Sequence, residues 1–247
     1  NRVHNSEEAI RSVKISQDAG FENITLDLIY GIPSLTNEKW MTNLSTAFSL
    51  NVPHISSYCL TVEPQTALAH FIKKRKIKNV DEEKSAAQFE IMIGEMTRNN
   101  FIQYEISNFC KEGFYSRHNS NYWKQEYYLG LGPSAHSFDG TSRQWNIANN
   151  NLYIQALQEG DLKFEKEILA KEQQYNEYVL TSIRTIWGTD LNCVGKIFGE
   201  ELLHYCIAES KSHIDTGNLI RRGNKLFLTG KGKLLADTIT SDLFKTT

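Results

Sequence analysis

The first hundred residues combine segments of helical period with segments of strand period. Apolar residues recur on one face of residues 6–19, and Gly20 is placed to end that helix. Residues 23–30 alternate instead, as the two faces of a strand do. One face carries Ile24, Leu26 and Leu28, and the other carries Thr25, Asp27 and Ile29. We therefore expect a helix followed by a strand.

The alternation of helix and strand continues to residue 107. Gly31 and Pro33 interrupt the first strand, and an amphipathic helix containing Trp40 follows. The pattern then predicts a strand over 54–62, a helix over 81–98 and a strand over 101–107. Helices of this length usually connect parallel strands, so the fold class expected is an α/β sheet whose ligands bind beyond the carboxyl ends of its strands.

Beyond Trp145 the pattern becomes mainly helical. Helices are predicted over 151–158 and 173–187, followed by a short helix that begins at 188–191 and another over 200–209. A ribbon over 219–229 turns at Gly223 and Asn224, and a closing helix begins at Lys231. This order predicts a winged-helix-like module. The domain boundaries expected are therefore 1–145 and 146–247.

The composition narrows the class of partner. The 247 residues are 40% hydrophobic and 23% charged, as in ordinary globular proteins, and the net charge is only −2. A charge so small removes the electrostatic argument for nucleic-acid binding or for adhesion to anionic membranes. Without an apolar stretch long enough to cross a bilayer, and without signal-peptide features at Asn1–His4, the protein is expected to be cytoplasmic.

The cysteines give no motif. Four are present, scattered as Cys59, Cys110, Cys193 and Cys206, and no Cys-x-x-Cys spacing occurs. Free thiols are the expected state. Because the chain opens on Asn1 and enters a helix almost at once, we expect it to be a fragment of a longer protein.

The segment from 117 to 136 carries the chemistry. His118 is the sharpest candidate, although a lone histidine is more often a hydrogen-bonded or surface residue. Its neighbours favour a cofactor pocket, because Arg117 could pair with a carboxylate and the rings of Tyr122 and Trp123 could stack on a planar ligand. His136 is a weaker second candidate, since the glycines before it, at 130 and 132, could simply permit a tight turn.

Other charged residues have competing interpretations. Asp27 either hydrogen-bonds a neighbouring loop or contacts a ligand, and its place near a strand end favours the ligand. Glu63 and Glu105 are second-rank candidates for acid or base chemistry. A basic cluster on the predicted ribbon could bind DNA in a winged-helix regulator, but Glu200 and Glu201 on the adjacent helix would repel phosphate.

Four motifs together resemble one family. They are Asp27–Gly31, Leu60–Pro64, Tyr104–Phe109 and Arg117–Trp123. In this order the chain resembles the HemW-type radical SAM haem chaperones, which are relatives of oxygen-independent coproporphyrinogen III oxidase. The resemblance implies a partial TIM-like barrel with parallel strands that binds S-adenosylmethionine beside a 4Fe-4S cluster, followed by a helical C-terminal domain.

The resemblance also implies roles for individual residues. Arg2, Asp27 and Ile29 correspond to S-adenosylmethionine contacts, and His118 corresponds to the ligand of haem iron. Haem or porphyrin and a haem-accepting apoprotein are the implied partners. Haem delivery is favoured by the motif from His118 to Trp123, and oxidative decarboxylation of coproporphyrinogen is the alternative.

One departure matters. The family holds its cluster with a Cys-x-x-x-Cys-x-x-Cys run, and no such run occurs in this chain. We therefore expect no catalytic residues and no radical activity in this fragment.

Overall fold

The computed structural model describes residues 4–246, so Arg2 lies outside the described residues. The chain divides into two compact units, with the division between Ser116 and Arg117. Each unit is described by itself. This division precedes the boundary expected after residue 145, which stays a prediction about where the family's barrel region ends.

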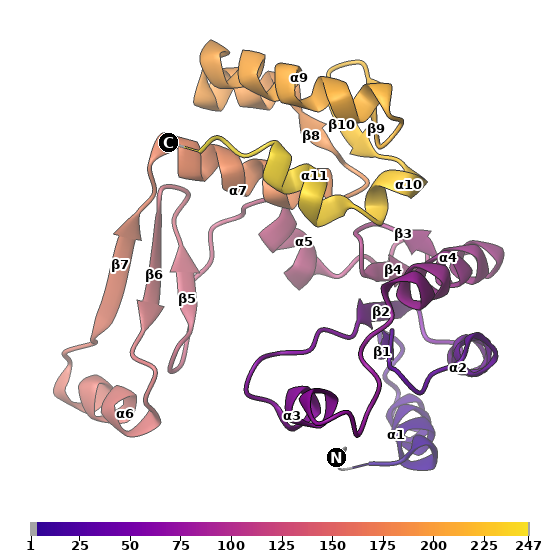
Figure 1. The fold of residues 1–247 in the computed structure, drawn as a ribbon. Coiled ribbons are helices and arrows are strands. Elements are labelled where there is room, and N and C mark those ends of the chain that lie inside the picture. Colours follow the sequence, from indigo (N-terminus) through magenta and orange to yellow (C-terminus); the bar gives the residue numbers. More distant parts are fainter. Residues whose placement is uncertain (1–3, 247) are drawn as a thin grey trace. The chain divides into compact units, whose positions relative to one another are not determined.

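The first unit has four strands and four helices in its described part. Its sheet has the order β1-β2-β4-β3. The elements, in chain order (Figure 1), are α1 (Ser6–Asp18), β1 (Thr25–Tyr30), α2 (Asn37–Ser49), β2 (His54–Cys59), α3 (Ala67–Lys73), α4 (Glu82–Arg98), β3 (Ile102–Gln103) and β4 (Asn108–Cys110). Strand β1 pairs parallel to β2, as the sequence predicts.

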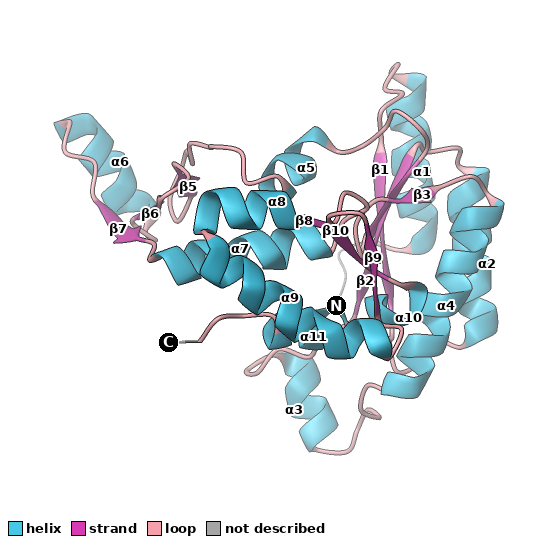
Figure 2. Cartoon of the chain, turned by 90° about the horizontal axis from the view of Figure 1, so that it is seen from above, coloured by secondary structure: helices cyan, strands magenta, loops and turns pink. Residues whose placement is uncertain are grey.

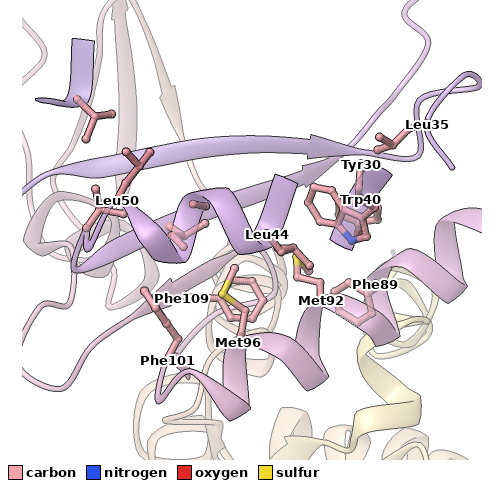
Figure 3. Packing of buried hydrophobic residues seen from close by; sticks show 14 residues of the cluster. Tyr30, Leu35, Trp40, Leu44, Leu50, Phe89, Met92, Met96, Phe101 and Phe109 are labelled. Atoms are coloured by element: carbon pink, nitrogen blue, oxygen red, sulfur yellow. The ribbon is translucent and has the colours of Figure 1, made fainter. Parts of the chain in front are cut away.

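One face of this sheet forms the core. Leu26, Ile55 and Phe109 are direct neighbours across β1, β2 and β4, so their side chains lie in one row. Helices α2 and α4 cover that face (Figure 2). Trp40 of α2 is fully buried among these side chains (Figure 3). Its indole N–H donates a hydrogen bond of 2.9 Å to the carbonyl oxygen of Gln88 in α4. Burying large apolar side chains of this kind contributes about 1.5–3 kcal/mol each.

The third strand differs from the expectation. Residues 101–107 do not form one parallel strand, because the chain turns back at Glu105 and β4 runs antiparallel to both β2 and β3. The buried Glu105 carboxylate accepts hydrogen bonds from the Ser107 backbone (2.9 Å) and the Asn108 side chain (2.8 Å), which stabilises the turn. The Glu105 side chain is therefore occupied by contacts within this turn. The short helix α3 was not expected from the sequence.

The second unit contains two small sheets and several helices. One sheet has the order β5-β6-β7 and the other β8-β10-β9. The elements are α5 (Arg117–Trp123), β5 (His136–Phe138), β6 (Ser142–Asn146), α6 (Asn150–Glu159), β7 (Phe164–Ile168), α7 (Lys171–Ile183), β8 (Thr189–Asp190), α8 (Leu191–Cys193), η1 (Val194–Phe198), α9 (Glu200–Asp215), β9 (Leu219–Arg222), β10 (Lys225–Leu228), α10 (Gly230–Lys233) and α11 (Ala236–Asp242).

Much of this unit follows the sequence pattern. The hairpin β9–β10 turns at Gly223 and Asn224, as predicted, and α6, α7 and α9 lie over the predicted helices. The sheet β5-β6-β7 was not predicted. Its strands are short, and β7 is exposed along its whole length, so it lacks the apolar alternation by which a sequence indicates a strand.

Candidate functional site

His118 lies on the seven-residue helix α5 and is exposed. Helical spacing explains what accompanies it: Asn121 and Tyr122 follow by three and four residues and so share its face. Trp123, five residues further on, is turned away from that face. The helix therefore presents an imidazole, an amide and a phenol together.

These side chains line a cavity of about 760 Å³ within the second unit. Small-molecule sites have volumes of about 300–1,000 Å³, so this cavity is large enough for a sizeable ligand. Its walls combine one face of α5 with the loop before β5 and with strands β5 and β6. The lining residues are His118, Asn121, Tyr122, Tyr128, Leu129, Gly130, Leu131, Ser134, Ala135, His136 and Arg143.

Aromatic rings form a continuous series along the cavity. The rings of His118 and Tyr122 meet edge-on with centroids 4.9 Å apart, and Tyr122 meets Tyr128 in the same way at 4.8 Å. Tyr128 in turn contacts Phe138, to which its backbone is also paired. The series gives the cavity flat apolar surfaces beside a nitrogen ligand, which suits a planar conjugated molecule.

The loop before β5 is held close to the strand by a glycine. A Cβ atom at Gly130 would lie only 2.1 Å from the carbonyl oxygen of His136, so a larger residue does not fit there. The amide of Asn146 fixes the same loop by donating to the carbonyl oxygens of Gly130 (3.2 Å) and Gly132 (3.0 Å). Leu129 and Leu131 of this loop line the cavity and are 76% and 81% exposed.

A charged pair lies at the inner wall. The guanidinium of Arg143 donates a hydrogen bond of 2.9 Å to the carboxylate of Glu177. Burial raises the pKa of Glu177, and the adjacent guanidinium opposes that rise. Burial also raises the pKa of the Tyr128 phenol, and Arg143 opposes this shift too. Arg143 therefore already has partners inside the protein.

The structure brings together part of the predicted haem set. His118 and Tyr122 line the cavity, together with the weaker candidate His136, whereas Arg117 and Trp123 are not among the lining residues. Tyr128, Leu129, Leu131 and Arg143 were not named as site residues from the sequence. Leu129 and Leu131 flank Gly130 within the segment that the sequence singled out, but nothing in the sequence links Arg143 to Glu177, 34 residues away.

The S-adenosylmethionine candidates lie on the other face of the first unit's sheet. Asp27 and Ile29 share one face of β1, as predicted, and because they alternate with the core residues this face points away from the core. Asp27 is exposed, so its carboxylate needs no buried partner. Its neighbours across the sheet on this face are Ser56 and Asn108.

A buried histidine lies beside Asp27. The ring nitrogens of His54 form hydrogen bonds of 2.7 Å with the Thr25 hydroxyl and 2.7 Å with the Tyr104 hydroxyl. Burial lowers the pKa of His54, and the negative charge of Asp27 partly opposes that shift. The sheet face that carries Asp27 therefore also carries a buried imidazole held by two hydrogen bonds.

The described residues contain no cluster of side chains suited to a metal ion. Between residues 4 and 246, no three or more His, Cys, Asp or Glu side chains converge as a metal site would require. The four cysteines are all free. None of the helices in this part of the chain has the length and apolar character needed to span a bilayer.

Comparison with known proteins shows which proteins the chain is similar to. The chain is 31% identical to the haem chaperone HemW of Bacillus subtilis over 96% of its own length and 63% of that protein. It is also 31% identical to HemW of Mycobacterium tuberculosis over 98% of its length and 60% of that protein. The chain is a relative of the HemW-type haem chaperones. The resemblance expected from the motifs is confirmed.

Further comparisons agree with the HemW relationship. Radical S-adenosyl methionine domain-containing protein 1, mitochondrial, of Dictyostelium discoideum is 30% identical over 99% of the chain and 62% of that protein. The solved coproporphyrinogen III oxidase HemN of Escherichia coli, described as a radical SAM enzyme, superposes with a TM-score of 0.76 at 19% identity, covering 99% of the chain and 60% of HemN. No family model matches.

The likeness to HemN shows that the chain has an α/β fold similar to that of HemN. The sheets described here are small and do not form a closed barrel. The chain spans 63% of the length of the Bacillus subtilis HemW and 60% of that of the Mycobacterium tuberculosis HemW.

Proposed function

We propose that this chain carries the haem-binding region of a HemW-type haem chaperone, with His118 as the nitrogen ligand of the haem iron and Tyr122 beside the macrocycle. The observation that carries the proposal is the exposed imidazole of His118 at the wall of the 760 Å³ cavity. An imidazole is a common axial ligand of haem iron, and a tetrapyrrole is a large flat apolar molecule. The aromatic series and the two exposed leucines fit such a cargo.

Arg117 and Trp123 belong to this proposal in a weaker sense. Arg117 is exposed at the start of α5, so its guanidinium can reach solvent near the cavity and pair with a propionate. Trp123 is turned away from the cavity face, and stacking on the macrocycle would need a rearrangement of α5. Their substitution should therefore affect haem binding less than substitution of His118.

The polar face of the first unit is proposed to hold S-adenosylmethionine. Asp27 and Ile29 stand on the same side of β1 near its carboxyl end, where ligands of parallel strands usually bind. Arg2 is proposed as a third contact. A 4Fe-4S cluster does not fit this chain, because the Cys-x-x-x-Cys-x-x-Cys run that binds it in the family is missing from the sequence.

Delivery of haem to an apoprotein is proposed for the whole protein. Coproporphyrinogen oxidation is the second candidate, which the fold likeness to HemN favours. For the whole protein we propose the family's architecture, a partial TIM-like barrel followed by a winged-helix-like module. The parallel pair β1–β2 would belong to the barrel, and the β9–β10 hairpin would belong to the module.

Titration with ferric haem tests the proposal. The wild-type chain should bind one haem with a shifted Soret band, and His118→Ala should weaken binding by at least about tenfold, a loss of about 1.4 kcal/mol. His204→Ala is the matched control, because His204 is an exposed histidine of the same unit outside the cavity. Equal affinity of wild type and His118→Ala would refute the assignment of His118.

A further inference from the structure

We propose that His136 supplies the second axial nitrogen to the haem iron, so that the bound haem has two histidine ligands. The inference rests on the proposed function and extends it. His136 is the first residue of β5, whereas His118 lies on α5. The two imidazoles therefore come from different elements and meet at one cavity.

Two of the chain's histidines line the cavity, and the others do not. Of the seven histidines, all of which lie in the described part, only His118 and His136 line the cavity. The lining residues include no cysteine or methionine, the other common side-chain ligands of haem iron. Tyr122 and Tyr128 could offer only a phenol oxygen, so a second nitrogen ligand to a haem held here would come from His136.

The ring of His136 is held without using its nitrogens. His136 is paired with Trp145 across β5 and β6, and the two rings are 5.9 Å apart between centroids at 33°. Among the described residues, this ring contact is the recorded interaction of the His136 side chain, and no hydrogen bond to either ring nitrogen is present. A metal ion could thus be bound without breaking an internal hydrogen bond.

The backbone of His136 is fixed on both sides. The close approach of Gly130 holds the preceding loop against its carbonyl, and the Gly130 amide donates to the Ser137 hydroxyl at 3.0 Å. The backbone carbonyl of the neighbouring Ala135 accepts a hydrogen bond of 3.0 Å from the backbone N–H of Asn146. This explains why the glycine-rich segment precedes a histidine: it fixes the position of a ligand as well as permitting a turn.

The spin state of haem iron depends on whether one or two imidazoles bind it. Haem iron with two histidine ligands is low-spin, and iron with one histidine and a weak or absent sixth ligand is high-spin. If His136 only packs on Trp145, its removal leaves the spin state unchanged. The spin state of bound haem therefore separates a ligand from a packing residue.

The test uses the chain with ferric haem at one equivalent, followed by absorption and electron paramagnetic resonance spectroscopy. Wild type should be low-spin. His136→Phe, which keeps a ring against Trp145, should still bind haem but become mainly high-spin, and added imidazole should restore the low-spin spectrum in His136→Ala. His204→Ala should match wild type, and circular dichroism should confirm folding of each variant.

Each outcome decides the point. A low-spin complex in His136→Phe identical to wild type overturns the His136 assignment while leaving haem binding at His118 intact. A high-spin wild-type complex also overturns it. If wild type binds no haem, the proposed function itself fails and the His136 assignment fails with it.

Discussion

The ring of His118 meets the ring of Tyr122 edge-on, with centroids 4.9 Å apart and ring planes at 85°. The two residues are four positions apart on α5, so the contact is set by the helix itself. Tyr122 thereby limits the orientations of the imidazole and adds an aromatic wall beside it. A ligand that coordinates His118 would meet the Tyr122 ring as well.

Replacing the Tyr122 ring should weaken haem binding moderately. Aromatic contacts contribute about 0.5–1.5 kcal/mol, so Tyr122→Leu should raise the haem dissociation constant about two- to tenfold. Tyr122→Phe keeps the ring and should change it by less than about twofold. Soret titrations of the two variants measure the difference. Equal weakening by Phe and Leu would show that the hydroxyl, and not the ring, matters.

A methyl group at residue 130 should disturb the cavity. In Gly130→Ala the added carbon collides with the His136 carbonyl, and overpacking of this kind costs about 1–3 kcal/mol of unfolding free energy. Haem affinity should fall as well. Gly94→Ala is the control, because Gly94 lies inside α4 with open space around it, and there alanine should stabilise by roughly 0.5–1 kcal/mol. Urea denaturation of both variants is the measurement, and equal stabilities would contradict the close approach.

The buried His54 should make stability depend on pH. Its folded pKa is lowered by burial below the ordinary value of about 6.5, so the unfolded chain binds more protons in the window between the two values. The contribution of the neutral, buried His54 to the free energy of unfolding is fully present above about pH 6.5. It is lost as the pH falls through that window. His54→Gln should flatten this dependence in urea denaturation.

Asp27 offers an internal check on the His54 effect. Its negative charge raises the His54 pKa, so Asp27→Asn should lower that pKa further and enlarge the loss of stability at acidic pH. An unchanged pH profile in both variants would mean that another group controls the acid sensitivity.

The chain should not cleave S-adenosylmethionine. After anaerobic reconstitution with iron and sulfide, no 5′-deoxyadenosine should form above background, because the sequence lacks the cysteine run that binds the cluster. A full-length HemW relative treated in parallel is the positive control. Product formation by this chain at a comparable rate would require another cluster site.

The first unit shows which parts of the fold a sequence can predict. The alternation around Asp27 gave β1 and both of its faces correctly, because one face packs on a core and the other does not. The segment at 101–107 misled the prediction because its apolar residues also suit a strand. The turn there depends on the buried Glu105 carboxylate, whose partners are visible only in the folded chain.

The site was predictable to a similar extent. His118 and Tyr122 were predicted because a cation, amides and two aromatic residues occur together in one short segment, which is a local signal. The places of Tyr128 and Arg143 in the cavity depend on strand pairing and on Glu177, which no short motif encodes. His136 was seen as a candidate, but its relation to His118 required the cavity that the two share.

Coordination of haem iron by His118 is tested most directly by pulsed electron paramagnetic resonance on ferric haem bound to chain labelled with ¹⁵N-histidine. We predict hyperfine coupling from the labelled imidazole nitrogens in wild type and the loss of one imidazole's coupling in His118→Ala. An identical coupling pattern in wild type and His118→Ala would contradict the account.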